Sequence, residues 1–224
     1  MDAVICMALI ELQNIYFQYP NCQKVLEGVN FSLDDGEKIG LLGGNGAGKT
    51  TLFHLILGLL VPDQGRVSIF GGYCGTETDF RKIRPRIGLL FQDPDDQLFC
   101  PSVIEDVAFG PLNMGMAHAD ARRRAVNTLE SLGIRHLMDR VPYHLSGGEK
   151  RLVSVAAVLS MRPEVLLLDE PTTGLDQNMT DRLIGVLHEY PAKAWIVISH
   201  DQRLIDGLTE KNYLLDCGRV VSTS

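Results

Sequence analysis

The sequence predicts an α/β fold in which a mostly parallel sheet carries helices on both faces. A glycine-rich loop joins an apolar strand to a helix near residue 45, and short apolar runs alternate with helix-length segments along the rest of the chain. Strand-type alternation is concentrated near the start, which predicts an additional antiparallel β layer. A chain of 224 residues with 45% hydrophobic residues is long enough for one substantial core or two smaller lobes.

The glycine-rich loop, Gly43-Gly44-Asn45-Gly46-Ala47-Gly48-Lys49-Thr50, fits the pattern of Gly, four residues, Gly, Lys, then Ser or Thr. We predict a strand over 38–42 before it and a helix over 51–60 after it. Glycines allow successive N–H groups to point inward, and the helix start adds partial positive charge, so the loop predicts a polyphosphate site. Lys49 is expected to reach the β and γ phosphates, and the Thr50 hydroxyl to ligate Mg²⁺.

The other expected elements surround this loop. Strands over 9–19 and 25–33, separated by the turn-like Pro20-Asn21, predict the small β layer. From about residue 93 to 160 the pattern changes to helices, which predicts a helical insert. The remaining predictions are strands at 66–70, 86–91, 165–169, 194–199, 212–216 and 219–222, and helices at 103–109, 119–132, 147–160 and 176–189.

Composition argues against several classes of protein. A net charge of −7 and a pI near 5.3 argue against a chain that coats nucleic acid. The start of the chain lacks the pattern of a signal peptide, and no apolar run approaches the length that spans a bilayer, so any membrane role is expected to come through partners. Without any Cys-x-x-Cys pair, we expect reduced cytosolic thiols and no structural zinc site at Cys6, Cys22, Cys74, Cys100 and Cys217.

Four further stretches carry chemistry. They are Leu145-Ser146-Gly147-Gly148-Glu149-Lys150-Arg151, Val165-Leu166-Leu167-Leu168-Asp169-Glu170-Pro171, Thr173-Gly174-Leu175-Asp176 and Ile196-Val197-Ile198-Ser199-His200. The first opens a helix with Ser and Gly, which predicts a second anion site. In the second, Asp169 stands at the carboxyl end of a strand, where such sheets bind nucleotide and metal. Together with the glycine-rich loop, these stretches resemble the ATP-binding cassette (ABC) ATPases over essentially the whole chain.

The resemblance implies the P-loop nucleoside-triphosphatase fold of the ABC ATPases in a single domain. Its RecA-like core and β layer would span about 1–92 and 161–224, and its helical subdomain about 93–160. The resemblance also implies ATP as substrate, Mg²⁺ as cofactor, and two subunits that close head to tail around two nucleotides. The dimer would be a homodimer or a heterodimer with a second ABC ATPase, and the partners would be integral membrane subunits rather than nucleic acid.

The resemblance assigns roles residue by residue. Tyr19 resembles the aromatic residue that stacks on adenine, and Gln92 resembles the Q-loop glutamine, which touches Mg²⁺ or the attacking water and relays to a transmembrane partner. Asp169 resembles the Mg²⁺ carboxylate, Glu170 the base that polarises the attacking water, and His200 the switch histidine at the γ-phosphate. The other implied nucleotide contacts are Gly43, Asn45, Gly46, Gly48, Lys49, Thr50 and Thr51, with Ser146, Gly147 and Gly148 facing the partner's ATP and Asp176 at the dimer seam.

The stretch from Phe91 to Phe99, with residues 103–113 after it, resembles the energy-coupling-factor branch, whose ATPases drive uptake of vitamins and of cobalt or nickel. Gln97 would be that branch's second glutamine in the active-site loop. We expect a docking groove for the membrane partner lined by Leu98, Phe99, Val103, Val107 and Phe109. The amino-acid sequence of this stretch is most like the cobalt/nickel type. The resemblance also implies a peripheral ATPase on the cytoplasmic face of the membrane.

Three alternatives stay open. A vitamin importer of the biotin type is the second substrate class. A soluble cassette protein of DNA repair, ribosomes or regulation is a different class, but repair relatives insert long coiled coils that the interval 51–145 cannot hold, and ribosomal relatives usually carry two cassettes. A small P-loop kinase explains neither the Ser146 stretch nor His200.

Overall fold

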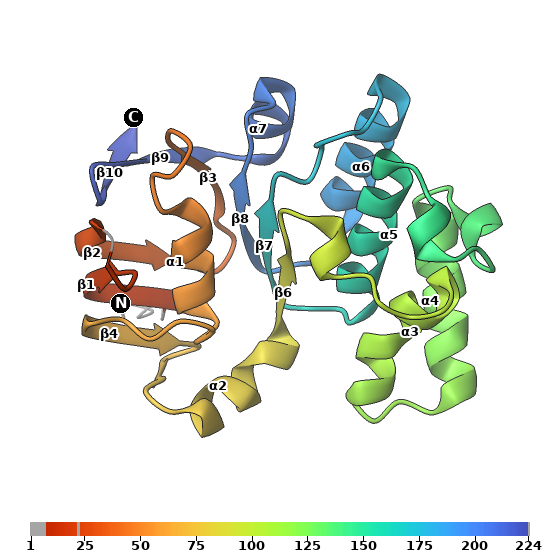
Figure 1. Ribbon diagram of the computed structural model, residues 1–224, viewed down its shortest axis with the longest axis horizontal. Coiled ribbons are helices and arrows are strands. Elements are labelled where there is room, and N and C mark those ends of the chain that lie inside the picture. The colour runs from red at the N-terminus through yellow and green to blue at the C-terminus, as the bar shows by residue number, and fades with distance from the viewer. Residues whose placement is uncertain (1–7, 22, 224) are drawn as a thin grey trace, which may run out of the picture.

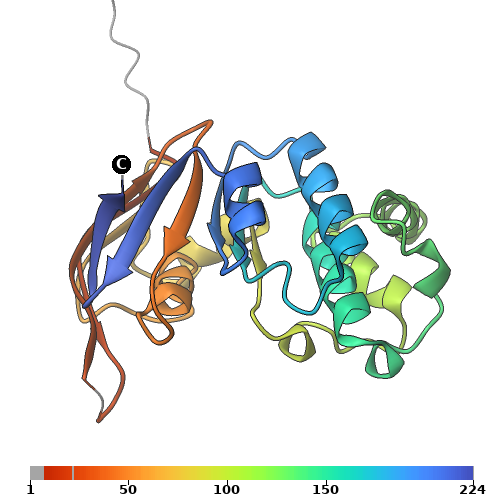
Figure 2. The same cartoon turned by 90° about the horizontal axis from the view of Figure 1, so that it is seen from above.

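The computed structural model describes residues 8–21 and 23–223, so Cys6, Cys22 and the start of the chain lie outside the described residues. From left to right in Figure 1, antiparallel strands are followed by helix α1 (Lys49–Ile56), parallel strands of a second sheet, helices α5 (Gly147–Ser160) and α6 (Gln177–Glu189), and then α3 (Val103–Asn113) and α4 (His118–Ser131). The last two strands of the second sheet, β9 (Lys211–Asp216) and β10 (Arg219–Thr223), lie above the antiparallel strands in this view. The view from above shows the same order of layers (Figure 2). None of the described helices is long and apolar enough to cross a bilayer.

The antiparallel sheet has the strand order β2-β1-β4-β5. Its strands are β1 (Ile10–Gln18), β2 (Lys24–Leu33), β4 (Gln64–Ile69) and β5 (Gly72–Tyr73). In β1 the register with β2 shifts after Leu12, and Asn14 there has a φ of 54°. This bulge changes the side-chain parity, so that Ile15 and Phe17 bury on the same side as Ile10 and Leu12.

The second sheet has the order β10-β9-β3-β8-β7-β6. Its strands are β3 (Lys38–Leu42), β6 (Ile87–Leu90), β7 (Val165–Asp169), β8 (Ala194–Ile198), β9 (Lys211–Asp216) and β10 (Arg219–Thr223). All neighbours pair in parallel except β9 and β10, so the predicted mostly parallel sheet with a separate antiparallel layer is confirmed. Alternate residues of β7 and β8 are buried on opposite faces of the sheet. Leu167 and Ile196 belong to the hydrophobic core that includes the buried side of α1, whereas Leu166 and Val197 belong to the core that includes α5.

The order of the parallel strands determines where the functional loops lie. The carboxyl ends of β3, β6, β7 and β8 meet at one edge of the sheet, where ligands bind in this class of fold. The glycine-rich loop, Gln92 and His200 come shortly after β3, β6 and β8, and Asp169 is the last residue of β7, with Glu170 next. Because β8 lies between β3 and β7, His200 emerges between the glycine-rich loop and Glu170.

Of the helices beyond α1, the four that the sequence predicts are present, whereas α2 and α7 were not predicted. They are α2 (Glu77–Ile83), α3 (Val103–Asn113), α4 (His118–Ser131), α5 (Gly147–Ser160), α6 (Gln177–Glu189) and α7 (Gln202–Leu208), with 3₁₀ turns at Arg84–Arg86, Pro94–Asp96, Arg135–Leu137 and Pro142–His144. The bounds predicted for α5 are confirmed to the residue, whereas α3 continues four residues past the predicted Phe109.

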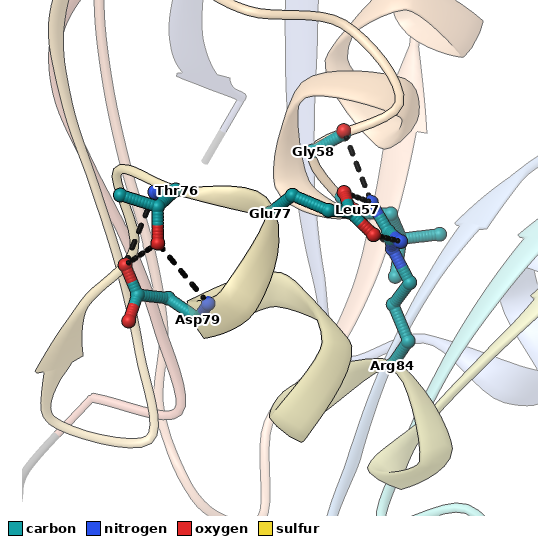
Figure 3. Close-up of polar contacts among 6 residues, drawn as sticks. All are labelled: Leu57, Gly58, Thr76, Glu77, Asp79 and Arg84. Carbon is teal, nitrogen blue, oxygen red and sulfur yellow. Dashed lines mark hydrogen bonds and ion pairs between the residues drawn. The ribbon is translucent and has the colours of Figure 1, made fainter.

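The helix after the glycine-rich loop ends earlier than predicted, at Ile56 instead of residue 60. Gly58 has a φ of 64°, a conformation that ends helices, and Arg84 donates from Nε to the Leu57 carbonyl at 3.0 Å and from Nη2 to the Gly58 carbonyl at 3.2 Å (Figure 3). Arg84 follows α2, a helix that the sequence did not predict and that Thr76 and Asp79 begin with a capping box. Arg84 therefore fastens the C-terminal end of α1 to the α2 segment.

Candidate active site

A cavity of about 740 Å³ opens where the loops after β3, β6, β7 and β8 meet. Most of the predicted nucleotide-site residues line it together. These are Tyr19, Asn45, Gly46, Gly48, Lys49, Thr50, Thr51, Gln92, Asp169, Glu170 and His200, with Val25, Ala47, Thr173 and Ile198 beside them. Residues that are far apart in the sequence thus form one concave site, as ligand cavities in α/β sheets require.

The glycine-rich loop is shaped by backbone angles that only glycine adopts easily. Gly48 has a φ of 103°, and a Cβ there would lie 2.8 Å from Cγ1 of Val25. Gly43 does not line the cavity; at its φ of 148° a Cβ would lie 2.4 Å from the carbonyl oxygen of Leu215. Lys49 donates from Nζ to the carbonyl of Gly43 at 2.7 Å and to that of Gly44 at 3.0 Å. The ammonium group is therefore held within the loop at the floor of the cavity.

Thr50 and Asp169 form the pair predicted for Mg²⁺. The Thr50 hydroxyl donates to Oδ2 of Asp169 at 2.6 Å, and Asp169 is 2% exposed. Burial raises the pKa of Asp169, and the hydrogen bond from Thr50 and the charge of Lys49 oppose that shift. In the part of the chain that the structure describes, no group of three His, Cys, Asp or Glu residues could hold a metal alone. A hydroxyl and one carboxylate fit Mg²⁺, which takes oxygen ligands and completes its shell with water and substrate phosphates.

Glu170 lies at the mouth of the same site in a strained conformation. Its φ is 50°, its N–H donates to the Ile198 carbonyl at 2.8 Å, and its side chain is 12% exposed. The carboxylate accepts the backbone N–H of His200 at 3.2 Å, and its other oxygen lies 3.5 Å from Nε2 of His200. Strain of this kind in a residue other than glycine persists where surrounding contacts enforce it, typically at functional sites. Glu170 is therefore placed as a carboxylate base would be, with His200 beside it.

Tyr19 lines the cavity next to the start of α1. Its hydroxyl lies 3.1 Å from Oγ1 of Thr51, and its ring meets Phe17 edge-on, with centroids 4.9 Å apart. The side chain is 36% exposed, so a fixed aromatic ring remains accessible at the cavity. Such a ring suits stacking on a nucleotide base.

The second anion site predicted at Ser146 does not join this cavity within one chain. Ser146 is exposed and caps α5: its Oγ accepts the Glu149 N–H at 3.3 Å, and Glu149 accepts the Ser146 N–H at 2.8 Å. The hydrogen bonds that the Glu149 carboxylate accepts from the N–H and the hydroxyl of Ser146 lower the pKa of Glu149. Gly147 lines a neighbouring cavity of about 580 Å³ with Gln92, and Gly148 packs so closely on Gly174 that a Cβ would lie 2.7 Å from its carbonyl oxygen.

Two side chains are engaged in contacts other than those predicted. Asp176 lies outside the 740 Å³ cavity and caps α6, accepting the Met179 N–H at 2.8 Å. Gln97 lines neither of the two cavities, because its amide binds the backbone of its own loop and of α5. It accepts the Phe91 N–H at 3.3 Å and donates to the Ser154 carbonyl at 2.9 Å. Gln97 thus lies in the same loop as Gln92, but its side chain lines neither cavity.

The predicted docking groove was wrong in three of its five residues. Leu98, Val103 and Val107 are 9%, 0% and 0% exposed and belong to the core. The helical period places residues 103 and 107 of α3 toward that core, whereas Ile104 and Leu112, on either side of the 6% exposed Ala108, are partly exposed. A groove of about 570 Å³ is found there, lined by Cys100, Pro101, Ile104, Glu105, Ala108, Phe109, Leu112, His118, Ala119 and Arg122. Phe99 and Phe109 are exposed beside it, with ring centroids 4.9 Å apart.

Sequence reasoning missed three residues next to the site. His54 and Arg151 line the 580 Å³ cavity, and Thr173 lines both cavities. His54 lies one helical turn after Thr50, and burial lowers its pKa while the charge of Asp169 raises it. The spacing of His54 from Thr50 was a usable signal, because residues four apart share one face of a helix.

Comparison with known proteins shows which family the chain resembles. The family model described as ABC transporter matches residues 26–173. A putative ABC transporter ATP-binding protein of Brucella suis is 49% identical over 199 residues, which cover 89% of this chain and 82% of that protein. The energy-coupling factor transporter ATP-binding protein EcfA of Methanothermobacter thermautotrophicus is 42% identical, with 96% of this chain and 70% of that protein covered.

Solved structures show the same likeness. The structure of cbiO1 from Clostridium perfringens, described as part of the ABC transporter complex cbiONQ, has a TM-score of 0.81 and 36% identity, covering 96% of this chain and 87% of that one. An ATP-binding cassette dimer in a post-hydrolysis state with ADP and Pi has a TM-score of 0.86 and 25% identity, covering 96% and 98%. With the family model and these relatives in agreement, the chain belongs to the ABC transporter family, as an ATPase whose hydrolysis of ATP is coupled to transport.

Proposed function

We propose that this chain is the ATP-hydrolysing subunit of a membrane importer for a micronutrient, and that the cargo is cobalt or nickel. The observation that carries the catalytic part is the single cavity that unites the glycine-rich loop, the Thr50–Asp169 pair and Glu170. The cargo rests on similarity to cbiO1, whose complex is named cbiONQ, and to relatives named energy-coupling factor ATP-binding proteins. Because those EcfA names specify no cargo, a vitamin importer of the biotin type is the second candidate.

In the proposed mechanism the loop N–H groups and Lys49 bind the phosphates of ATP, and Tyr19 stacks on the adenine. Thr50, Asp169 and Gln92 would hold Mg²⁺, which neutralises charge on the β and γ oxygens when bound. Glu170 then accepts the proton of a water molecule that attacks the γ-phosphate, and His200 stabilises the charge that develops there.

The proposed active form is a head-to-tail dimer, either of two copies or with a second ABC ATPase. Ser146 and Gly147 are exposed at the start of α5 and lie outside the cavity of their own chain. An exposed helix start with free N–H groups binds anions, so this end of α5 suits the γ-phosphate held by a partner. Asp176 is proposed to lie at the dimer seam, and a related cassette is solved as a dimer.

The proposed membrane contact is the groove beside α3, which we call the α3 groove and define by the residues that line it around Ile104 and Phe109. Exposed aromatic rings next to an apolar groove mark interaction sites. The α3 groove follows the loop of Gln92 in the chain, so a segment of an integral membrane subunit bound there would act on that loop. The chain would then lie on the cytoplasmic face of the membrane, and with a net charge of −7 no nucleic-acid partner is proposed.

Purification of the tagged protein from gently solubilised membranes of its source, with mass spectrometry of what accompanies it, tests the importer. We expect integral membrane proteins with the parent chain and their loss with Phe99→Asp. Tyr73→Asp is the matched control, because Tyr73 is 63% exposed and Phe99 65%, but Tyr73 lies in β5 of the antiparallel sheet. If Phe99→Asp retains the membrane proteins, the α3 groove is not the membrane contact. If only soluble proteins accompany the parent chain, the proposed transport function is refuted.

A further inference from the structure

Arg151 is a buried cation that the proposed mechanism does not use. It stands on α5, one helical turn after Gly147 and Gly148, and is 1% exposed. Nη1 donates to the Phe91 carbonyl at 2.7 Å, and Nη2 donates to the Gln92 carbonyl. Within residues 8–21 and 23–223 its Nε has no hydrogen-bond partner. Burying a guanidinium group costs free energy unless hydrogen bonds compensate for the lost water. The two carbonyls that Arg151 binds therefore determine where its guanidinium group lies.

Those two carbonyls mark the point where β6 ends and the loop carrying Gln92 begins. Two more contacts join the same loop to α5. Lys150 donates from Nζ to Asp95 at 2.6 Å, and Gln97 donates to the Ser154 carbonyl at 2.9 Å. Lys150 and Gln97 act further along the loop, whereas Arg151 binds the carbonyls of the two peptide groups that flank the Cα of Gln92. Arg151 therefore sets where the Gln92 side chain begins.

Arg151 also lies close to the reacting groups. It lines the 580 Å³ cavity together with Thr50, Gln92 and Gly147. Burial lowers the pKa of Arg151, and the negative charges of Asp169, Asp93 and Glu170 raise it. The charged and titratable groups of the site are therefore within electrostatic range of the guanidinium group, and its hydrogen bonds to the loop form beside the proposed Mg²⁺ ligands.

We propose that Arg151 is a positioning residue that fastens Gln92 to the start of α5, so that the loop and the Ser146 end of the helix move together. The inference rests on the proposed role of Gln92 at the metal or the attacking water. It implies that a nucleotide bound at Ser146 from a partner chain changes the place of Gln92 in the chain's own cavity.

The test begins with Arg151→Met, which keeps the length of the side chain and removes its donors. Arg84→Met is the matched control, because Arg84 also donates to two consecutive backbone carbonyls, those of Leu57 and Gly58 (Figure 3). Arg84 lines neither the 740 Å³ nor the 580 Å³ cavity. Both variants are expected to lower Tm. Only Arg151→Met is expected to lower kcat, by about tenfold or more with KM for ATP within about twofold, because a misplaced group costs transition-state stabilisation more than binding.

A double-mutant cycle with Gln92→Ala separates positioning from stability. If Arg151 acts through Gln92, Arg151→Met lowers Tm by the same amount in both backgrounds but lowers kcat only where Gln92 is present. An equal fold loss of kcat in both backgrounds overturns the inference. If Arg151→Met does not fold, Arg151→Lys replaces it in the same cycle, since it keeps the charge and loses the two-pronged hydrogen bond.

Failure of the proposed function gives a different pattern. If Gln92→Ala hydrolyses ATP at the parent rate, the role of Gln92 is refuted and the inference about Arg151 falls with it. If Gln92→Ala lowers kcat, and Arg151→Met lowers kcat by the same factor with and without Gln92, the role of Gln92 stands. Only the inference about Arg151 is then overturned.

Discussion

Glu170, the proposed base, has a strained backbone that neighbouring contacts hold in place. A residue other than glycine at a φ of 50° costs about 1–3 kcal/mol, and this cost is offset by its N–H bond to Ile198 and the contact of its carboxylate with His200. Both contacts come from the end of β8, which pairs with β7. The pairing of these two strands therefore orients the carboxylate toward the cavity. The strain supports a catalytic role for Glu170 independently of its motif.

Glu170→Gln keeps the size of the side chain and removes the base. We expect the variant to bind ATP, to hydrolyse it about 10² to 10⁴ times more slowly, and to accumulate as an ATP-bound dimer. Single-turnover hydrolysis and size-exclusion chromatography with ATP measure these two effects. Hydrolysis at the parent rate would show that Glu170 is not the base.

Lys49→Ala removes an ammonium group that the loop holds through the carbonyls of Gly43 and Gly44. Charge-assisted hydrogen bonds contribute about 1.5–3 kcal/mol each, so the loss of two phosphate contacts is expected to weaken ATP binding by a hundredfold or more, as measured by calorimetry. Lys24→Ala, at an exposed position of β2, is the control and should bind as the parent does. Parent-like affinity of Lys49→Ala would remove the lysine from the site.

The difference between predicted and missed site residues also has a physical reason. Lys49 and Asp169 belong to motifs whose residue types and spacing indicate phosphate and metal binding. The sequence alone therefore predicted that they lie in the site. Arg151 follows Glu149 and Lys150, and such a charged run normally indicates a solvated helix face. Only the fold shows that α5 lies against the loop after β6, where a guanidinium group finds two backbone carbonyls.

At the scale of elements, Arg84 joins the end of α1 to the segment of α2. Arg84→Met leaves the Leu57 and Gly58 carbonyls without these donors, so the free energy of unfolding is expected to fall by about 1–2 kcal/mol in urea denaturation. Arg81→Met, on the exposed side of the same α2 segment, should change it by less than about 0.5 kcal/mol. Equal effects of the two substitutions would contradict this role of Arg84.

Glu164 joins the starts of β6, β7 and β8, because it binds Arg86 and Lys193. These hydrogen bonds lower the pKa of Glu164 to about 2 from 4.5. A carboxyl with a lowered pKa in the folded state stabilises the fold above its unfolded value and loses that stabilisation as pH falls.

We therefore expect Glu164→Gln to lower the free energy of unfolding at pH 7 by about 1 kcal/mol, since the pair is partly exposed. The difference from the parent should narrow as pH falls from 4.5 towards 2. Denaturant titrations at a series of pH values measure it, and a difference independent of pH would contradict the ion-pair origin.

Elements with a single strong signal were predicted well. Val165–Asp169 and Gly147–Ser160 were confirmed to the residue, because a purely apolar run and a Ser-Gly-Gly helix start leave little choice. Helices α2 and α7 were missed, since each has only seven residues and too few turns to show a helical period. The α3 groove was misplaced because clustering of apolar residues in sequence does not say which face of a helix they occupy.

At the scale of the molecule, α5 links the proposed nucleotide contact to the proposed membrane contact. Its first turn is the proposed second anion site, and its buried residues pack with α3, whose outer face forms the α3 groove. The layers in Figure 1 place α1 and the glycine-rich loop on one side of the parallel sheet and this helical part on the other. A membrane subunit bound to the α3 groove would therefore reach the cavity through the loop of Gln92, not through the glycine-rich loop.

The most direct test of the account is ATP-driven uptake by vesicles that contain this chain with the membrane proteins that co-purify with it. Labelled Co²⁺ and Ni²⁺ are compared with labelled biotin, and vesicles made with Glu170→Gln serve as the control. The account predicts that Co²⁺ or Ni²⁺ accumulates with ATP and that the Glu170→Gln vesicles accumulate neither. Accumulation of biotin instead would contradict the proposed cargo, and ATP hydrolysis without uptake of any of the three would contradict the proposed importer.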